Sequence, residues 1–337
     1  MNAKTILITG AAGFVGSNLT DTLLARGHRV IGVDNLSHGL LSNLEEARQN
    51  PRFSFHQLDV CDYDSFSETA KGIDVVAHLA AYKIPRYGKA EETLLINARG
   101  GHNALEIAAQ QGAKFILAST SDVYGKNPSI PFSETSDCVI GSSTVPRWGY
   151  AVSKLYDEHL AFAYADSRGI PVTIIRIFGS YGPRQALSWW GGPQSVFIDN
   201  LLNGEPLSIH GDGLQTRSFT YISDTVRGFV AAIEQNDVGG EIFNIGNTKE
   251  ITIVDLAKMI HRLCGATHPL KLQFTPYDEI SKGRKYEDVR RRVPDVAKAA
   301  AKLGFQARVD LEEGLKITID WQKAVRATEH GLATVKQ

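Results

Sequence analysis

The sequence predicts an α/β fold in which a doubly wound parallel sheet is followed by a smaller α/β domain. Two observations in the first half of the chain support this. Short β-branched or apolar runs alternate there with helix-like stretches, and a glycine-rich turn directly follows the first run. Near-continuous apolar strands that alternate with helices indicate a parallel sheet covered on both faces. A third observation is that this pattern changes after Phe178.

The expected elements follow in chain order. Strands are expected at residues 5–9, 29–34, 53–58, 75–79, 115–119 and 172–177, and helices at 15–26, 91–111 and 150–167. Glycine, proline and aromatic residues cluster at 179–193, which predicts a loop-rich region. Shorter elements are expected at 195–202, 206–210, 224–234, 253–263 and 311–321. Residues beyond about 327 lack apolar periodicity and are expected to fray.

Composition excludes several classes of protein. The 337 residues contain 36 Lys and Arg against 37 Asp and Glu, a formal net charge of −1, which argues against a nucleic-acid-binding surface. No apolar run approaches the roughly 20 residues of a membrane helix, and no signal-peptide pattern opens the chain. The cysteines Cys61, Cys138 and Cys264 are far apart and form no disulfide or metal pattern. We expect a soluble cytoplasmic protein without a metal, either an enzyme or a binding domain.

The glycine-rich turn predicts a dinucleotide site. Gly10, Gly13 and Gly16 follow the first strand with the spacing G-x-x-G-x-x-G, and Phe14 and Val15 open the next helix. Glycines there allow a tight turn and close backbone approach to a pyrophosphate, and the helix N-terminus supplies N–H donors. The expected fold is therefore Rossmann-like. A plain strand-to-helix turn is the alternative.

Acidic residues at strand ends bear on the type of dinucleotide. Asp34 ends the second strand, 24 positions beyond Gly10. A carboxylate there accepts hydrogen bonds from ribose hydroxyls and repels a 2′-phosphate, which favours NAD over NADP. The alternative is an aspartate that caps a turn. Asp59 and Val60 end the third strand, where Asp59 would meet the adenine edge or serve as a helix N-cap.

A tyrosine and a lysine form the candidate catalytic pair. Tyr150 and Lys154 are four residues apart, so both project from one face of a helix. A nearby cation lowers the pKa of a phenol, so that Tyr150 can act as a base near neutral pH. Lys154 can also hold a nicotinamide ribose. Thr120 and Ser121 end a strand at the expected ligand crevice, where their hydroxyls can bind a sugar oxygen. An ordinary helix face is the alternative for the pair.

Together these motifs make the chain resemble the extended short-chain dehydrogenases/reductases of the nucleotide-sugar epimerase/dehydratase family. The resemblance covers about residues 4–322. It rests on residues 9–16, Asp34-Asn35, Asp59, 78–81, Asn97, 119–125, Tyr150 with Lys154, 176–184 and 211–222. It implies an NAD-binding Rossmann domain at 1–178, with segments returning near 215–245. It also implies a nucleotide-sugar domain at 179–214 and 246–327.

The resemblance implies a tightly bound NAD that is regenerated in each turnover. The residues implied to bind it are Gly10, Gly13, Phe14, Val15, Gly16, Asp34, Asn35, Asp59, Val60, Leu79, Ala80, Ala81, Lys83, Asn97, Tyr150 and Lys154. The residues implied to bind a nucleotide sugar, UDP-linked by expectation, are Arg86, Thr120, Gly179, Arg184, Gln194, Ser195, Val196, Ile209, His210, Arg217 and Arg291. Arg291 stands for one of Arg290 to Arg292, which with Arg217 would neutralise the diphosphate. A solvated surface run is the alternative for these arginines.

The resemblance leaves the exact reaction open. Its members share oxidation of the sugar at C4, with Tyr150, Lys154, Thr120, Ser121 and Asp122 as the implied catalytic residues. Dehydratases have Asp-Glu at positions 121 and 122, decarboxylases Ser-Glu, and epimerases small or hydroxyl residues; this chain has Ser-Asp. We predict a 4-epimerase of a UDP-hexose or UDP-hexuronate. The alternatives are a UDP-glucuronate decarboxylase, a dehydratase and, in another class, a non-catalytic NAD-sensing protein.

Several details complete the expectations. Asp122 would act as a base, cap a helix or bind a hydroxyl. A hexuronate carboxylate beside it would need either a protonated Asp122 or a nearby cation, with Arg86 and Arg184 as candidates. Gly179 would enlarge the site by removing a side chain. The segment Trp189-Trp190-Gly191-Gly192 would form a lid or pack internally. The resemblance implies a homodimer through the helices at 91–111 and 150–167, and burial of their apolar positions against their own sheet is the alternative. No nucleic-acid or membrane partner is expected.

Overall fold

A parallel sheet of seven strands forms the centre of the computed structural model, which describes residues 3–83, 90–281 and 283–335, with side chains up to 327. The strand order is β11-β6-β5-β4-β1-β2-β3, and every neighbouring pair is parallel. The strands are β1 (Thr5–Thr9), β2 (Arg29–Asp34), β3 (Phe53–Gln57), β4 (Val75–His78), β5 (Lys114–Thr120), β6 (Val172–Ile177) and β11 (Glu241–Ile245). The predicted fold class is confirmed.

Helices cover both faces of this sheet, because successive side chains of a strand point to opposite sides. Ile6 and Ile8 pack in one core with α1 (Phe14–Ala25) and α6 (Ile222–Glu234). Leu7, between them, packs in a second core on the other face. The helices of that second core are α2 (Tyr63–Thr69), α3 (Ala90–Gln111) and α4 (Trp148–Arg168). The continuous apolar runs of the sequence therefore reflect strands that are buried on both sides.

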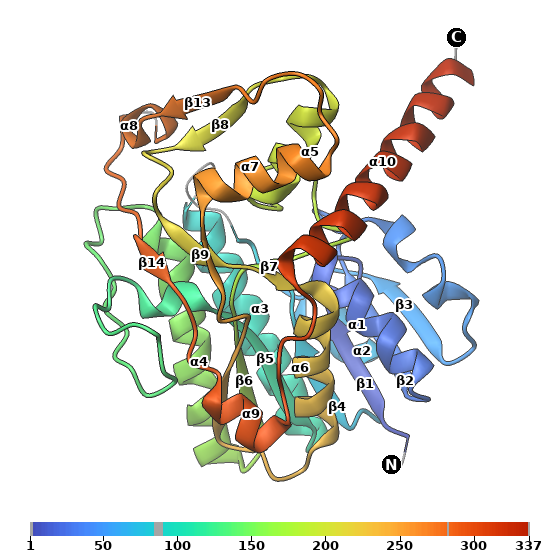
Figure 1. Ribbon diagram of the computed structural model, residues 1–337. Helices are drawn as coiled ribbons and strands as arrows, with labels where there is room; N and C mark the ends of the chain where they lie inside the picture. Colours follow the sequence, from blue (N-terminus) through green and yellow to red (C-terminus); the bar gives the residue numbers. More distant parts are fainter. Residues whose placement is uncertain (1–2, 84–89, 282, 336–337) are drawn as a thin grey trace.

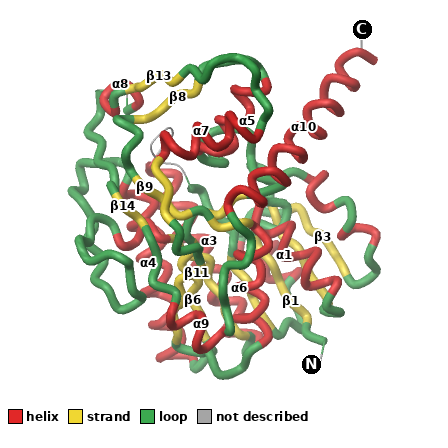
Figure 2. Tube along the Cα trace, in the orientation of Figure 1, coloured by secondary structure: helices red, strands yellow, loops and turns green. Residues whose placement is uncertain are grey.

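A smaller part sits beyond the carboxyl ends of the strands (Figure 1). In Figure 2 its strands β8 and β13 lie apart from the central sheet below them. Its helices are α5 (Pro193–Leu202), α7 (Ile253–Leu263) and α8 (Tyr277–Ile280). Its strand pairs are β8 (Leu207–His210) with β13 (Leu272–Thr275), and β9 (Thr216–Ser218) with both β12 (Glu250–Thr252) and β14 (Arg291–Arg292).

The remaining elements complete the chain. They are β7 (Ser180–Tyr181) paired with β10 (Thr220–Tyr221), the 3-10 helices η1 (Leu41–Leu44), η2 (Ala47–Gln49) and η3 (Ser121–Tyr124), and the helices α9 (Ala297–Leu303) and α10 (Leu311–Val335). The end of α10 projects away from the body (Figure 1). Among the described residues, no helix has the length and apolar character to span a membrane.

Among the departures from the expected elements, two concern the central sheet and the last helix. The strand β11, which was not expected, extends the sheet at its edge by pairing with β6. The helix α10 continues to Val335, past the expected fraying at 327, because this stretch contains no proline to end it. The proposed division into two domains stays a prediction.

Candidate active site

The turn between β1 and α1 leaves room only for glycine. Gly10 has φ +70°, and a Cβ there would lie 2.9 Å from the Ala80 nitrogen. A Cβ on Gly16 would lie 2.1 Å from the Gly10 carbonyl oxygen. Phe14 and Val15, in the first turn of α1, line the central cavity. The helix N-terminus and its close-packed turn thus form a cradle that fits a pyrophosphate.

A polar shelf at the carboxyl ends of β2 and β3 lies next to this cradle. The Asp34 carboxylate accepts hydrogen bonds from the Ala12 nitrogen at 3.0 Å and the Leu36 nitrogen at 2.8 Å. Burial raises the pKa of Asp34. Asp34 therefore caps the turn after β2, which was the alternative to a role in ribose binding. A carboxylate has about four acceptor positions, so these bonds leave room for a ribose hydroxyl as well.

Asp59 belongs to the same shelf. Its carboxylate accepts from the Asn35 amide at 3.0 Å and from the Cys61 nitrogen at 2.8 Å. It is not the N-cap of α2, because Asp62 occupies that position and accepts from the Ser65 nitrogen. The helix-cap alternative for Asp59 is therefore wrong, and its carboxylate is held at the strand end by Asn35.

Hydrogen bonds to buried polar groups fix the loop after β4. The Thr9 hydroxyl accepts from the Leu79 and Ala80 nitrogens, both at 3.1 Å, and lies 2.8 Å from His78 Nδ1. Asn97 joins this loop to α4: it accepts from the Tyr82 nitrogen and donates to the Ser153 hydroxyl. Leu79, Ala81 and Lys83 consequently line the cavity, while Ala80, Asn97 and Val60 lie behind it.

The expected catalytic residues converge on one cavity of about 400 Å³. Thr120, Ser121, Asp122 and Tyr150 line it, and they come from the end of β5, from η3 and from α4. A volume of this size is typical of a small-molecule site. Lys154 lies one turn after Tyr150 on α4 and is buried. The tyrosine and the two hydroxyl residues thus face one ligand space.

The direction of the Tyr150 pKa shift differs from the expectation. The sequence predicted that Lys154 would lower it. In the structure, burial raises the pKa of Tyr150, and the negative charges of Asp122 and Asp157 raise it further. Burial is thus the main physical reason for the difference, and the Lys154 ammonium lies 3.0 Å from the Asp157 carboxylate.

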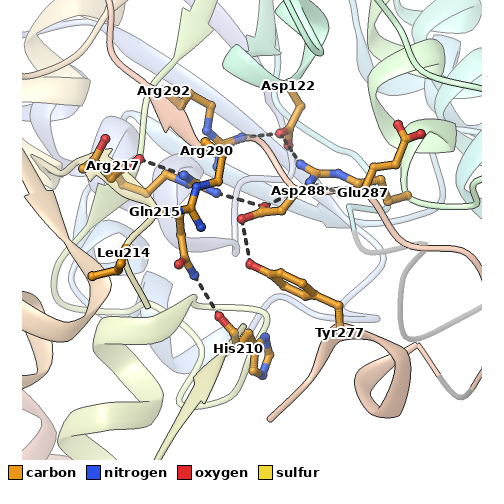
Figure 3. A network of polar contacts seen from close by, with 12 residues as sticks. Asp122, His210, Leu214, Gln215, Arg217, Tyr277, Glu287, Asp288, Arg290 and Arg292 are labelled. Atoms are coloured by element: carbon orange, nitrogen blue, oxygen red, sulfur yellow. Dashed lines mark hydrogen bonds and ion pairs between the residues drawn. The ribbon is translucent and has the colours of Figure 1, made fainter. Parts of the chain in front are cut away.

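Asp122 is paired with two arginines (Figure 3). Its Oδ1 forms an ion pair with Arg292 and accepts from Arg147 Nη2 at 3.4 Å. The cap of η3 is not Asp122 but Thr120, whose hydroxyl accepts from the Asp122 nitrogen at 3.2 Å. The Asp122 carboxylate is therefore balanced by cations beside the cavity instead of capping a helix.

The network continues to a second carboxylate, Asp288 (Figure 3). Asp288 Oδ1 accepts from Arg217 at 3.1 Å and from Arg147 at 3.2 Å, and Asp288 Oδ2 accepts from the Tyr277 hydroxyl at 2.8 Å. Burial and the neighbouring arginines lower the pKa of Arg217 to about 10, and the arginines also lower the pKa of Asp288. Arg217, Asp288 and Tyr277 all line the cavity.

Among the described residues, the arginines at the cavity differ in part from those expected. Arg184 pairs with Asp21 at 2.5 Å and does not line the cavity, and Arg86 lies outside the described residues. Arg291, chosen from its triplet, pairs with Glu250 with half of its side chain exposed. Arg292 lines the cavity instead. Both residues form β14, and neighbouring side chains of a strand point to opposite sides.

The expected nucleotide-binding residues divide into lining and supporting groups. Gln194 and His210 line the cavity, whereas Ser195, Val196 and Ile209 do not. Gly179 also lines it, but a Cβ there would lie 2.2 Å from the Ser218 carbonyl oxygen. Glycine at 179 is therefore required by a close backbone approach, which corrects the expectation that it enlarges the site.

The tryptophan pair joins the two parts of the molecule across the cavity. Trp190 packs against His38 with ring centroids 4.1 Å apart and against Tyr82 edge-on at 5.4 Å. Trp189 stacks on His210 at 4.0 Å. His38 and Tyr82 follow strands of the central sheet, and His210 ends β8. The segment thus covers the cavity and packs on both sides of it.

Sequence reasoning did not identify several cavity residues. Arg147, Gln185, Gln215, Tyr277, Tyr286 and Asp288 line the cavity without belonging to the predicted site, and Arg292 was predicted only as one member of the triplet 290–292. Arg147 alone carried a positional signal, because it precedes Tyr150 by less than one helical turn. The others lie on segments that only the fold brings together.

Comparison with known proteins agrees with this geometry. A sequence model of the NAD dependent epimerase/dehydratase family matches residues 6–246, and the chain belongs to this family. It is accordingly an enzyme with NAD as its cofactor, and the glycine cradle and the Asp34 carboxylate fit that dinucleotide.

Two curated relatives are decarboxylases. The chain is 39% identical to UDP-N-acetyl-alpha-D-glucosaminuronate decarboxylase of Bacillus cytotoxicus, over 96% of this chain and 98% of that protein. It is 35% identical to UDP-glucuronic acid decarboxylase 1 of Arabidopsis thaliana, over 97% of this chain and 72% of that protein. Among solved structures, UDP-glucuronic acid 4-epimerase from Bacillus cereus, in complex with UDP-glucuronic acid and NAD, has a TM-score of 0.85 and 33% identity, over 95% and 99% of the two chains.

Proposed function

We propose that this enzyme is a decarboxylase of a UDP-linked hexuronate. The observation that carries the proposal is the Asp122–Arg292 ion pair in the wall of the cavity that Thr120 and Tyr150 also line. Epimerisation at C4 requires groups at the C4 oxygen and room for the sugar to turn. A paired carboxylate and guanidinium beside these groups are more useful to a reaction at C5 and C6.

The chain's own residues can carry the proton transfers. Tyr150 takes the proton from the C4 hydroxyl, and the Thr120 hydroxyl holds that oxygen. A bound NAD would supply the acceptor for the C4 hydride and the donor that returns it at the end. The resulting 4-ketone receives the electron pair of the C5–C6 bond as the carboxylate leaves as carbon dioxide. A proton is then added at C5, so the net reaction consumes one proton and leaves NAD unchanged.

The charges of the cavity suit an anionic substrate. Arg147, Arg217 and Arg292 face two carboxylates, Asp122 and Asp288, which leaves an excess of positive charge for a diphosphate and a sugar carboxylate. A hexuronate carboxylate that binds Arg292 would compete with Asp122 for it. Asp122, with Arg292 engaged by the substrate, could then take up a proton from solvent and deliver it to C5.

A 4-epimerase remains the second candidate. It is favoured by the 33% identical structure of a UDP-glucuronic acid 4-epimerase. It is also favoured by Asp122 itself, whose side chain is one methylene shorter than the glutamate that the resemblance leads one to expect in a decarboxylase. Both candidates use Tyr150 and Thr120 in the same way, so only the product separates them.

The deciding experiment identifies the product. The purified protein is incubated with UDP-glucuronate, UDP-N-acetylglucosaminuronate and UDP-glucose, and the products are identified by mass spectrometry and NMR. Loss of carbon dioxide supports the proposal, and a product of unchanged mass supports the epimerase. If protein that carries NAD leaves all three compounds unchanged, the proposal is wrong and the non-catalytic alternative gains support.

The proposal includes a cytoplasmic homodimer formed through α3 and α4. Leu95 on α3 and Val152 and Tyr156 on α4 are 62%, 42% and 48% exposed, an unusual exposure for large apolar side chains on adjoining helices. Light scattering after size-exclusion chromatography should give the mass of two chains. Leu95→Glu should give the mass of one chain, and a wild-type monomer would contradict the proposed dimer.

A further inference from the structure

A buried ion pair lies behind the cavity, on the helix that carries Tyr150. Lys154 and Asp157 are three residues apart on α4, each is 1% exposed, and Lys154 Nζ lies 3.0 Å from Asp157 Oδ2. Moving two charges out of water is strongly unfavourable, and this cost is offset only by good pairing. Apolar residues at both positions would avoid that cost. The presence of a carboxylate there calls for an explanation.

The neighbouring helix leaves space for this carboxylate. Gly101 of α3 faces Asp157, and a Cβ on Gly101 would lie 2.7 Å from Asp157 Oδ1. That oxygen is buried and has no hydrogen-bond partner among the described residues. The carboxylate is therefore only half satisfied, and its bond to Lys154 is the contact that holds it.

Other charged groups around the pair are engaged elsewhere or neutral. Glu158, next on α4, is bound to Arg176 at 2.6 Å and accepts from the Ser119 hydroxyl at 2.5 Å. His78 of β4 is buried, and burial together with the Lys154 charge lowers its pKa to about 3, so it is neutral. Asp122, on the cavity side of Tyr150, is balanced by Arg147 and Arg292. Lys154 is thus the cation available to Asp157 among the described residues.

We propose that Asp157 is a positioning residue for the reaction, which fixes the Lys154 ammonium and reduces the effect of its charge on Tyr150. This inference rests on the catalytic roles given to Tyr150 and Lys154 under the proposed function. An ammonium group has three N–H donors. One is directed to Asp157, which leaves two for the hydroxyls of a nicotinamide ribose.

The pair has a measurable consequence for the acidity of Tyr150. Burial, Asp122 and Asp157 all raise the pKa of the Tyr150 phenol. Asp157→Asn removes one negative charge at nearly constant volume, so the phenol should titrate at lower pH. Because Tyr150 acts as a base, activity rises with pH through its pKa, and the acid limb of the pH–rate profile should move to lower pH. A nearby charge typically shifts a pKa by about one unit.

The test measures this titration with and without turnover. For wild type, Asp157→Asn and the exposed control Asp166→Asn on the same helix, phenolate absorbance is titrated in NAD-loaded protein without sugar. The signal of Tyr150 is obtained by subtracting a Tyr150→Phe background in each case. The pH profile of kcat is then recorded with whichever sugar nucleotide is converted. We expect a shift of about one unit downward for Asp157→Asn in both readouts and none for Asp166→Asn.

The outcomes separate this inference from the proposed function. An unchanged Tyr150 titration in folded Asp157→Asn overturns the inference, even if turnover falls, because a purely structural role would lower stability without moving the titration. Absence of turnover with every sugar, together with a shifted titration, overturns the proposed function alone. If Asp157→Asn does not fold, Gly101→Ala replaces it. Its Cβ displaces the carboxylate, so a smaller shift in the same direction is expected, and no shift again overturns the inference.

Discussion

The two sides of the cavity are built in different ways. The cofactor side is one local turn, in which Gly10, Gly13 and Gly16 bring the backbone of β1 and α1 close to the end of β4. The sugar side is a network of charged side chains from separate segments: Asp122, Arg147, Arg217, Asp288 and Arg292. A site formed by the backbone of one turn can be recognised from residues that are neighbours in the sequence. A site formed by side chains from separate segments exists only in the folded chain. Variants on the two sides should therefore separate cofactor binding from chemistry.

The largest expected effect follows from Tyr150→Phe. Loss of the phenolic oxygen removes the base, and general-base catalysis contributes about 10²- to 10⁴-fold. Turnover should fall by that factor while the NAD content of the purified protein stays at the wild-type level. Both are measured on one preparation, with absorbance of the NAD released by denaturation as the second readout. Loss of NAD in this variant would show that cofactor binding and chemistry are not separated between the two sides of the cavity.

A smaller effect is expected from Arg292→Met, with Arg291→Met as its matched control. Removing Arg292 leaves Asp122 with Arg147, at 3.4 Å, and removes a cation from the cavity. Turnover should fall about ten- to a hundredfold, since one charge-assisted contact is worth about 1.4 to 2.8 kcal/mol in the transition state.

Arg291 should behave differently, although it is the neighbouring residue. Its side chain is 51% exposed and contacts Glu250 away from the cavity, so Arg291→Met should leave kcat/KM within about twofold of wild type. If Arg291→Met lowered kcat/KM more than Arg292→Met, the assignment of Arg292 to the cavity and of Arg291 to the surface would be wrong.

This pair of arginines shows where prediction from sequence ends. The strands and the glycine turn were predictable because apolar periodicity and glycine spacing are local. The neighbouring residues in the sequence could not show whether Arg291 or Arg292 faces the cavity. The strand β14 has two residues, and its orientation is set by pairing with β9, more than seventy residues earlier. Asp288 and Tyr277 carried no local signal at all. The raised pKa of Tyr150 follows first from its burial and then from the charges of Asp122 and Asp157, and sequence spacing alone had predicted the opposite direction.

On the cofactor side, Asp34→Ala tests the shelf beside the cradle. The variant loses an acceptor for the ribose hydroxyls. It also loses the two hydrogen bonds from the Ala12 and Leu36 nitrogens, which hold the turn after β1 and the turn after β2. The affinity for NAD should fall about tenfold, which corresponds to about 1.4 kcal/mol. Calorimetry on protein stripped of NAD measures this, with the exposed Asp64→Ala as control. Unchanged affinity would remove Asp34 from the cofactor site.

The smallest effects are expected from the tryptophan pair, and they sharpen the comparison because the two residues are adjacent. Trp190 packs on His38 and Tyr82, on the cofactor side, whereas Trp189 stacks on His210, on the nucleotide side. An aromatic contact is worth about 0.5 to 1.5 kcal/mol, or roughly two- to tenfold. Trp190→Ala should therefore speed NAD dissociation by that factor, followed by the fluorescence of bound NADH. Trp189→Ala should instead raise KM for the nucleotide sugar at constant NAD dissociation. If both variants changed only NAD dissociation, or only KM for the nucleotide sugar, Trp189 and Trp190 would act together. The cofactor side and the sugar side of the cavity would then not be independent at this segment.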